Sequence, residues 1–162
     1  MCVIIASRQR TRKIGRHLLK QIIAALLADL KVENVELGVQ LVAAPEMARL
    51  NEKFLRHQGP TDVITFDYLD NAARASRLHQ SVCSRDGCAT LHGEIVICVD
   101  EAVAQARKFG TSWQSEIIRY VVHGILHLRG FDDSRADVRR RMKREENRHL
   151  RELSHRFALS KL

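Results

Sequence analysis

The stretch LHGEIVICV at residues 91–99 decides the fold class. Its second half is an unbroken run of apolar residues, several of them β-branched, and this predicts a strong strand. Three segments with a helical spacing of apolar residues follow it, at about residues 100–109, 112–128 and 134–153. A strong strand followed by helices indicates an α/β arrangement.

The same order of strand and helix recurs toward the N-terminus. Short strands are expected at residues 2–7, 36–42 and 63–66, and helices at residues 18–30 and 45–54. The chain has 162 residues, which is the usual length of one domain. We therefore expect one compact α/β domain over residues 1–162, in which a small mixed sheet of about four strands packs with about five helices.

Residues 70–90 show no period of either kind and are mostly polar. A loop of this length inside a compact domain is usually functional or mobile, so a lid and a disordered flap are both open interpretations. Cys83 and Cys88 lie in this loop and could pair or bind a metal ion. Because no second pair of thiols stands at zinc-finger spacing, we expect neither.

The charge of the chain favours a polyanionic partner. Lys and Arg number 27 against 19 Asp and Glu, which gives a formal net charge of +8, and the sequence pI is about 9.8. Nucleic acid is the commonest polyanion for a basic domain, because Lys and Arg neutralise its phosphates whatever the base sequence. Anionic lipid is the weaker alternative.

The sequence also bears on the compartment. No apolar run is long enough to span a bilayer, so we expect no membrane partner. Its four cysteines form no disulfide framework, which indicates a reducing compartment. The N-terminal apolar residues precede the basic ones, the reverse of a secretory signal, and we interpret them as part of a mature, cytoplasmic protein.

The segment VVHGILHLRGFDD at residues 121–133 carries the chemistry. His123 and His127 are four residues apart on a predicted helix, so both imidazoles lie on one face and could bind one ion. Gly130 can end the helix in a left-handed conformation and turn the chain back, bringing Asp132 or Asp133 toward the histidines as a third ligand. Two alternatives remain: the histidines make ordinary hydrogen bonds, and the aspartates cap the next helix.

Four motifs in the right order resemble one family, the YbeY endoribonucleases. HGILHLRGFDD at 123–133 is similar to the family's HGxLHLxGYDH, and the other matches are LN at 50–51 with FLR at 54–56, PTDVITF at 60–66, and GEI at 93–95. The resemblance implies a compact α/β fold, a zinc ion in a cleft, and metal-dependent cleavage of single-stranded RNA in ribosomal RNA maturation and ribosome quality control. It also implies ribosomal RNA, the ribosome and ribosome-associated proteins as partners.

The resemblance carries over residue by residue, with departures. It implies His123, His127 and Asp133 as metal ligands and Arg56 as the catalytic arginine, although Arg56 stands one residue later than in the family motif. Asp133 replaces the family's third histidine, and a carboxylate is a shorter, harder ligand that leaves the identity of the metal uncertain. Phe131 in place of tyrosine, and Asp67 in place of proline, are expected to matter less.

The last predicted helix is rich in arginine. Ser134 is expected to be its N-cap, with Asp137 as the capping-box partner. Because its apolar residues face inward, its basic residues should face solvent, where the cluster could follow an RNA backbone. The residues we select for RNA binding are Arg139, Arg140, Lys143 and Arg144. A merely solvated helix face, partly neutralised by nearby glutamates, is the alternative.

Two other functions are compatible with parts of the sequence. Two histidines at this spacing also open the metalloprotease motif His-Glu-x-x-His, but Gly124 occupies the place of its general base. The stronger rival is a non-catalytic, ribosome-associated RNA-binding factor, because Asp133 could mark a structural or degenerate metal site.

Overall fold

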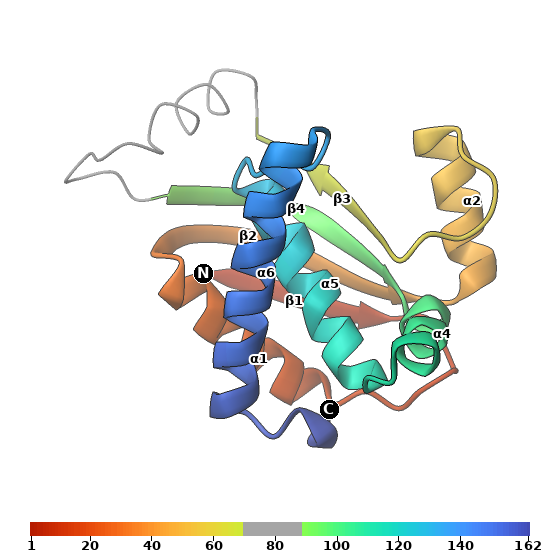
Figure 1. Cartoon of the computed structure of the whole chain (residues 1–162), viewed down its shortest axis with the longest axis horizontal. Helices are drawn as coiled ribbons and strands as arrows, with labels where there is room; N and C mark the ends of the chain where they lie inside the picture. The colour runs from red at the N-terminus through yellow and green to blue at the C-terminus, as the bar shows by residue number, and fades with distance from the viewer. Residues whose placement is uncertain (70–88) are drawn as a thin grey trace.

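Four strands form one mixed sheet in the order β1-β2-β4-β3. The computed structural model describes residues 1–69 and 89–162. The strands are β1 (Cys2–Ser7), β2 (Val32–Val42), β3 (Val63–Asp67) and β4 (Ala89–Cys98). β1 and β4 both run parallel to β2, whereas β3 runs antiparallel to β4 and forms an edge (Figure 1). The strand predicted from LHGEIVICV is therefore an inner strand of the sheet.

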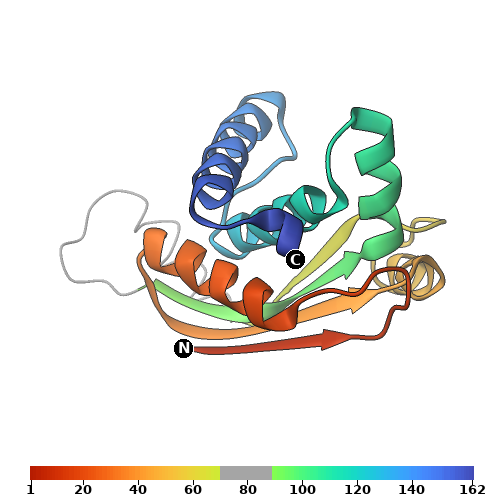
Figure 2. The ribbon, with the colours of Figure 1, turned by 90° about the horizontal axis from the view of Figure 1, so that it is seen from below.

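Helices cover one face of the sheet and part of the other. The α-helices among the described residues are α1 (Arg16–Asp29), α2 (Ala44–Leu55), α4 (Val99–Phe109), α5 (Trp113–Leu128) and α6 (Ala136–Arg156), and a short 3-10 helix, η1 (Leu159–Lys161), follows them. Figure 2 shows α1, α5 and α6 on the same side of the sheet. The predicted α/β fold, with four strands and five α-helices in the described residues, is confirmed.

The main core lies between the sheet and these helices. Along β2, Leu37, Val39 and Leu41 alternate with more exposed residues and are buried toward α1. β4 places Ile95 and Ile97 in the same layer, and both are 0% exposed. This alternation follows from the two-residue period of a strand. The helix that carries the histidines, α5, therefore packs against the buried face of these strands.

A smaller cluster lies on the opposite face, where α2 packs. Met47 of α2 is completely buried against a group that includes Ile64 of β3 and Val96 of β4. The ring of Phe54, near the end of α2, meets the ring of Phe66 edge to face at 5.0 Å. These contacts fix the C-terminal end of α2 beside the edge strand β3 (Figure 1).

Several boundaries differ from the sequence predictions. β2 begins at Val32 rather than at residue 36, and α6 begins at Ala136 and ends at Arg156. The predicted capping box is wrong: the N-cap is Arg135, and no side chain caps the helix. Ser134 is instead engaged by Asp132, whose carboxylate accepts from the Ser134 backbone N–H at 3.0 Å and from its hydroxyl. This local turn competes with capping.

Two predictions fall largely or wholly on residues that the structure does not describe. The expected loop at 70–90 lies outside the described residues except for its last two positions, which belong to β4. Cys83 and Cys88 also lie outside them. Among the described residues, no helix combines the length and the apolar character needed to cross a bilayer.

Candidate metal centre

Helix α5 carries the two histidines on a partly exposed side of the helix. The helix begins after Ser112, whose hydroxyl accepts a hydrogen bond from the backbone N–H of Ser115 at 3.1 Å. Most of its remaining surface is buried in the core. The side chains of His123 and His127 are 26% and 28% exposed, so both rings are held by protein yet reach solvent.

The chain turns back directly after α5, as predicted from Gly130. Gly130 has a φ of 86°, which a residue with a side chain rarely adopts. Its backbone N–H donates to the carbonyl of His127 at 2.8 Å, and the N–H of Phe131 donates to the carbonyl of Leu126 at 3.0 Å. These two bonds are the Schellman arrangement, and they direct the following residues back along the helix toward the histidines.

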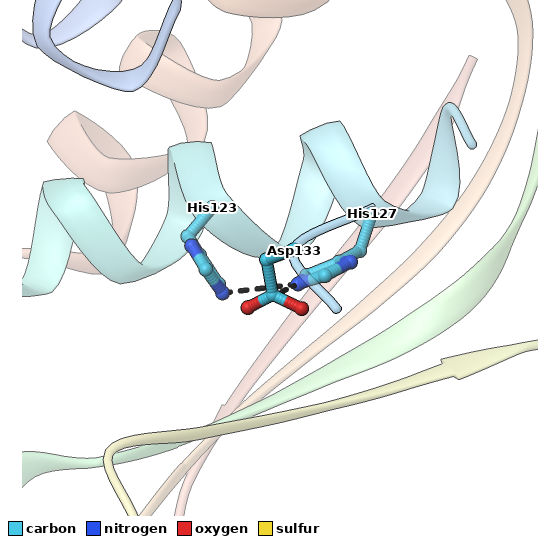
Figure 3. Close-up of side chains that lie close together, drawn as sticks. All are labelled: His123, His127 and Asp133. Carbon is cyan, nitrogen blue, oxygen red and sulfur yellow. Dashed lines mark hydrogen bonds and ion pairs between the residues drawn. The ribbon is translucent and has the colours of Figure 1, made fainter. Parts of the chain in front are cut away.

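Asp133 completes a group of three potential ligands (Figure 3). The Nε2 atoms of His123 and His127 are 3.1 Å apart, and Nε2 of His127 lies 3.8 Å from Oδ2 of Asp133. One ligand atom from each residue lies within 4.8 Å of the others, so the group could hold a metal ion. Two nitrogen ligands of a tetrahedral zinc ion are about 3.4 Å apart, close to the spacing of the two rings.

The hydrogen bonds of the two Nδ1 atoms determine what the Nε2 atoms can do. Nδ1 of His123 lies 3.2 Å from a carboxylate oxygen of Glu146, and Nδ1 of His127 lies 3.1 Å from the carbonyl oxygen of Phe131. Both partners only accept, so each Nδ1 is assigned the proton. In the neutral rings both Nε2 atoms then carry lone pairs, and two lone pairs 3.1 Å apart repel each other unless a cation lies between them.

The electrostatics of His127 favour the form that binds metals. Burial lowers the pKa of His127, and the neighbouring His123 lowers it further, while Asp133 acts in the opposite direction. A depressed pKa keeps the ring neutral near pH 7, as metal ligation requires. The spacing of the three potential ligands and the electrostatics of His127 therefore both fit a divalent cation.

Helix α6 supports this group from the side. Nε of Arg139 donates to the backbone carbonyl of Asp133 at 2.9 Å. The guanidinium of Arg141 lies over the ring of Phe131, 5.6 Å from its centre, and the carbonyl of Phe131 is the partner of His127. Lys143 donates to Glu146 at 2.6 Å. The start of α6 thus holds the turn, the third ligand and the partner of His123.

The four residues predicted to bind RNA therefore differ in their surroundings. Arg139 and Lys143 already have partners at the candidate metal centre. Arg140 and Arg144 are exposed on α6, and neither guanidinium has a hydrogen bond or ion pair with the described residues. Binding of RNA by any of the four stays a prediction.

Arg56 is not joined to the histidine group by a hydrogen bond or an ion pair among the described residues. It is the C-cap of α2, exposed, with a left-handed φ of 58°. Its side chain makes no hydrogen bond or ion pair with the residues described, including the histidine group. Its catalytic role stays a prediction. Between the two aspartates left open by the sequence, the geometry favours Asp133, because Asp132 is occupied by Ser134.

Glu146 is the residue that the sequence interpretation missed. As one of the glutamates near the arginines of this helix, Glu146 is expected from the sequence to neutralise a solvated face, yet it is only 4% exposed. Burial alone would raise its pKa, but hydrogen bonds from His123, Lys143 and Arg119 lower the pKa to about 2. Its position, four residues after the buried Met142 and four before the buried Leu150, is the signal that could have placed it on the inward face.

Known proteins are similar to this chain in sequence and in fold. The family model described as Endoribonuclease YbeY matches residues 4–154. A protein of Frankia alni named Endoribonuclease YbeY is 34% identical over 93% of this chain and 81% of its own length, and one of Aquifex aeolicus with the same name is 31% identical over 94% and 87%. The solution structure of TM1509 from Thermotoga maritima superposes with a TM-score of 0.62 at 24% identity, covering 94% of this chain and 89% of that one. The chain belongs to the YbeY endoribonuclease family.

Proposed function

We propose that this protein is a metal-dependent endoribonuclease, specific for single strands, that acts in ribosomal RNA maturation and ribosome quality control in the cytoplasm. His123, His127 and Asp133 would hold one zinc ion. The observation that carries the metal dependence is the pair of Nε2 atoms 3.1 Å apart, each left with a lone pair by the hydrogen bond of its Nδ1. Family membership supports RNA as the substrate, and the net charge of +8 agrees with it.

The donor set is consistent with zinc. Two imidazole nitrogens and one carboxylate oxygen are a known catalytic zinc set, which leaves a fourth position open. The side chain of Asp133 is 47% exposed, so the open side faces solvent. A carboxylate also suits harder ions such as Mn²⁺, and the metal is therefore part of what the experiment below measures.

The residues of the chain have separate tasks in the proposed reaction. When bound, the ion would supply Lewis-acid polarisation of a phosphate oxygen or of water. Arg56 would hold the scissile phosphate through a forked, charge-assisted contact. Arg140 and Arg144 would bind the RNA backbone on the solvent side of α6. The 2′-hydroxyl of the RNA would attack the phosphorus and break its bond to the 5′-oxygen. The proton of the 2′-hydroxyl would pass to solvent, and the 5′-oxygen would take a proton from solvent, because the proposal assigns no side chain as general base or acid.

The test measures metal content and cleavage of single-stranded RNA together. The parent should carry about one ion per chain and cleave. His127→Ala should lose both, because one of two imidazoles is gone. Asp133→His should keep or tighten zinc, because a nitrogen ligand replaces a harder oxygen. His155→Ala, which removes an exposed histidine of α6, is the matched control and should change neither.

Three outcomes would contradict parts of the proposal. Unchanged metal content in His127→Ala would refute the assigned site. A parent that binds both metal and ribosomal RNA but does not cleave would instead favour the non-catalytic RNA-binding alternative. Cleavage of paired and unpaired RNA at equal rates would contradict single-strand specificity.

A further inference from the structure

A buried carboxylate stands behind the candidate metal centre, on the side away from solvent. Glu146 of α6 is 4% exposed, and it accepts hydrogen bonds from three side chains. Oε1 accepts from Arg119 at 2.7 Å and from Lys143 at 2.6 Å, while Oε2 faces Nδ1 of His123 at 3.2 Å. One oxygen is thus committed to two cations, and the other is left for the imidazole.

The two cations fix the position of this carboxylate. Arg119 of α5 is itself held by Glu116 at 3.4 Å and by Asn147 at 3.0 Å, so its guanidinium has little freedom to move. A carboxylate anchored in this way cannot rotate away from His123 without leaving a buried charge unpaired. The arrangement of Glu146 is therefore set by the protein and does not depend on a bound ion.

We propose that Glu146 is the positioning residue of the metal centre: its carboxylate holds His123 in the tautomer with the proton on Nδ1, so that Nε2 is free to ligate. This inference rests on the proposed function and deepens it. A carboxylate hydrogen-bonded to a ligating imidazole also increases the basicity of the ligand, and loss of such a partner typically weakens metal binding 10- to 100-fold, as an order of magnitude.

The two histidines differ in a way that makes the inference testable. His127 is oriented by a backbone carbonyl, that of Phe131, which no substitution removes. His123 is oriented by a side chain. Replacement of Glu146 should therefore disturb one ring and leave the other as an internal reference.

The experiment uses Glu146→Gln, which keeps the shape and removes the charge. Zinc affinity is measured by competition with a chromophoric chelator, and the tautomers of both rings are read from ¹⁵N chemical shifts of the metal-free protein at a pH where both are neutral. We expect zinc to bind about 10- to 100-fold more weakly, and the Nδ1-protonated fraction of His123 to fall while that of His127 stays unchanged. Glu146→Asp keeps the charge but shortens the side chain, so it should also weaken zinc binding and lower the Nδ1-protonated fraction of His123. It replaces Glu146→Gln as the test if that variant does not fold.

Glu145→Gln is the matched control. Glu145 is the preceding residue of α6 and has the same charge, but it pairs with Arg148 at 2.6 Å and more distantly with His149 at 4.0 Å, and not with His123. The control variant should leave the zinc affinity and the tautomers of His123 and His127 unchanged. If Glu146→Gln binds zinc as tightly as Glu145→Gln does, with His123 unaltered, the positioning role is refuted while the metal site stands. If the parent binds no zinc, the proposed function fails, and the tautomer of His123 alone decides whether Glu146 orients that ring.

Discussion

Gly124 of α5 lies directly against Ile95 of β4. A Cβ built on Gly124 would stand 2.8 Å from Cδ1 of Ile95 and 2.9 Å from its Cγ2, closer than carbon atoms normally approach. The glycine between the two histidines therefore lets α5 lie close to the sheet. A glutamate at position 124, as in the metalloprotease motif, would meet the side chain of Ile95 in the core.

Gly124→Ala should destabilise the fold. Alanine favours a helix over glycine by about 1 kcal/mol, but overpacking a tight core costs about 1–3 kcal/mol, and Ile95 is completely buried. We expect a net loss of up to about 2 kcal/mol in the free energy of unfolding, measured by urea denaturation. The variant should also bind zinc more weakly, because α5 must shift to accommodate the methyl group.

The control for this prediction is Ile95→Val, which removes the Cδ1 atom closest to the new methyl group. Combined with Gly124→Ala, it should cost less than the sum of the two single changes, as a double-mutant cycle would show. Additive effects would mean that Ile95 is not what excludes a side chain at position 124.

The strands and helices could be predicted because their signals are local. The apolar run at 95–99 and the helical spacing of residues 112–128 both gave elements close to those observed. The start of β2 could not be predicted, because residues 32–35 pair with Ala89 to Leu91 across a register irregularity. This pairing depends on a strand far away in the sequence.

The candidate site was predictable in part for the same reason. His123, His127 and the turn at Gly130 follow from helix geometry, and the three predicted ligands do come together. The role of Glu146 could not be inferred in this way, because it depends on how α6 docks against α5. The hydrogen bond from Arg139 to the carbonyl of Asp133 depends on the same docking, and a basic cluster on one face of a helix does not predict it.

Arg140 and Arg144 should contribute to RNA affinity without affecting the metal. Both are exposed and without partners among the described residues, so each is free to neutralise a phosphate. In the double variant Arg140→Gln with Arg144→Gln, the negative slope of log affinity against log salt should become shallower by about 1.4, because each phosphate contact with a single strand contributes about 0.7. Fluorescence anisotropy of a labelled single-stranded RNA at several salt concentrations measures this slope.

A control with the same change in net charge is Arg148→Gln with Arg156→Gln. These arginines of α6 are bound to Glu145 and Asp29, respectively, at 2.6 and 2.5 Å. Because they are already paired, we expect a smaller change in the salt slope. Equal slopes for the two double variants would show that only overall charge matters, and not the face formed by Arg140 and Arg144.

His149 should make the fold sensitive to mild acid. Its side chain is almost completely buried on α6, and burial, followed by the charge of Arg148, lowers its pKa from the ordinary 6.5, against smaller opposing effects of Glu152, Glu145 and Asp29. As the pH falls, His149 therefore takes up a proton at a higher pH in the unfolded chain than in the folded chain. The contribution of His149 to stability is complete above about pH 6.5 and is lost as the pH falls toward the lower, folded-state pKa.

The measurement is the free energy of unfolding at about pH 8 and about pH 5 for the parent and for His149→Gln. The parent should lose more stability across this range than the variant does. An equal loss in both proteins would mean that His149 is not responsible for the acid sensitivity.

Arg56 combines a proposed catalytic role with an unfavourable backbone. Its φ is 58°, and the only other non-glycine residue with positive φ among those described is Lys31, at 54°. A left-handed conformation costs a residue with a side chain about 1 kcal/mol relative to glycine, so each position would be more stable as glycine. If the guanidinium of Arg56 takes part in catalysis, replacement of Arg56 by glycine should raise the stability and lower the activity.

Arg56→Gly and Lys31→Gly form a matched pair that tests this. Both should raise the free energy of unfolding by about 0.5–1 kcal/mol. Cleavage of single-stranded RNA should fall at least about 100-fold in Arg56→Gly, the scale of losing one transition-state contact, and stay unchanged in Lys31→Gly. Full activity in a stabilised Arg56→Gly would remove Arg56 from the catalytic machinery and leave the binding of the phosphate to other residues of the basic surface.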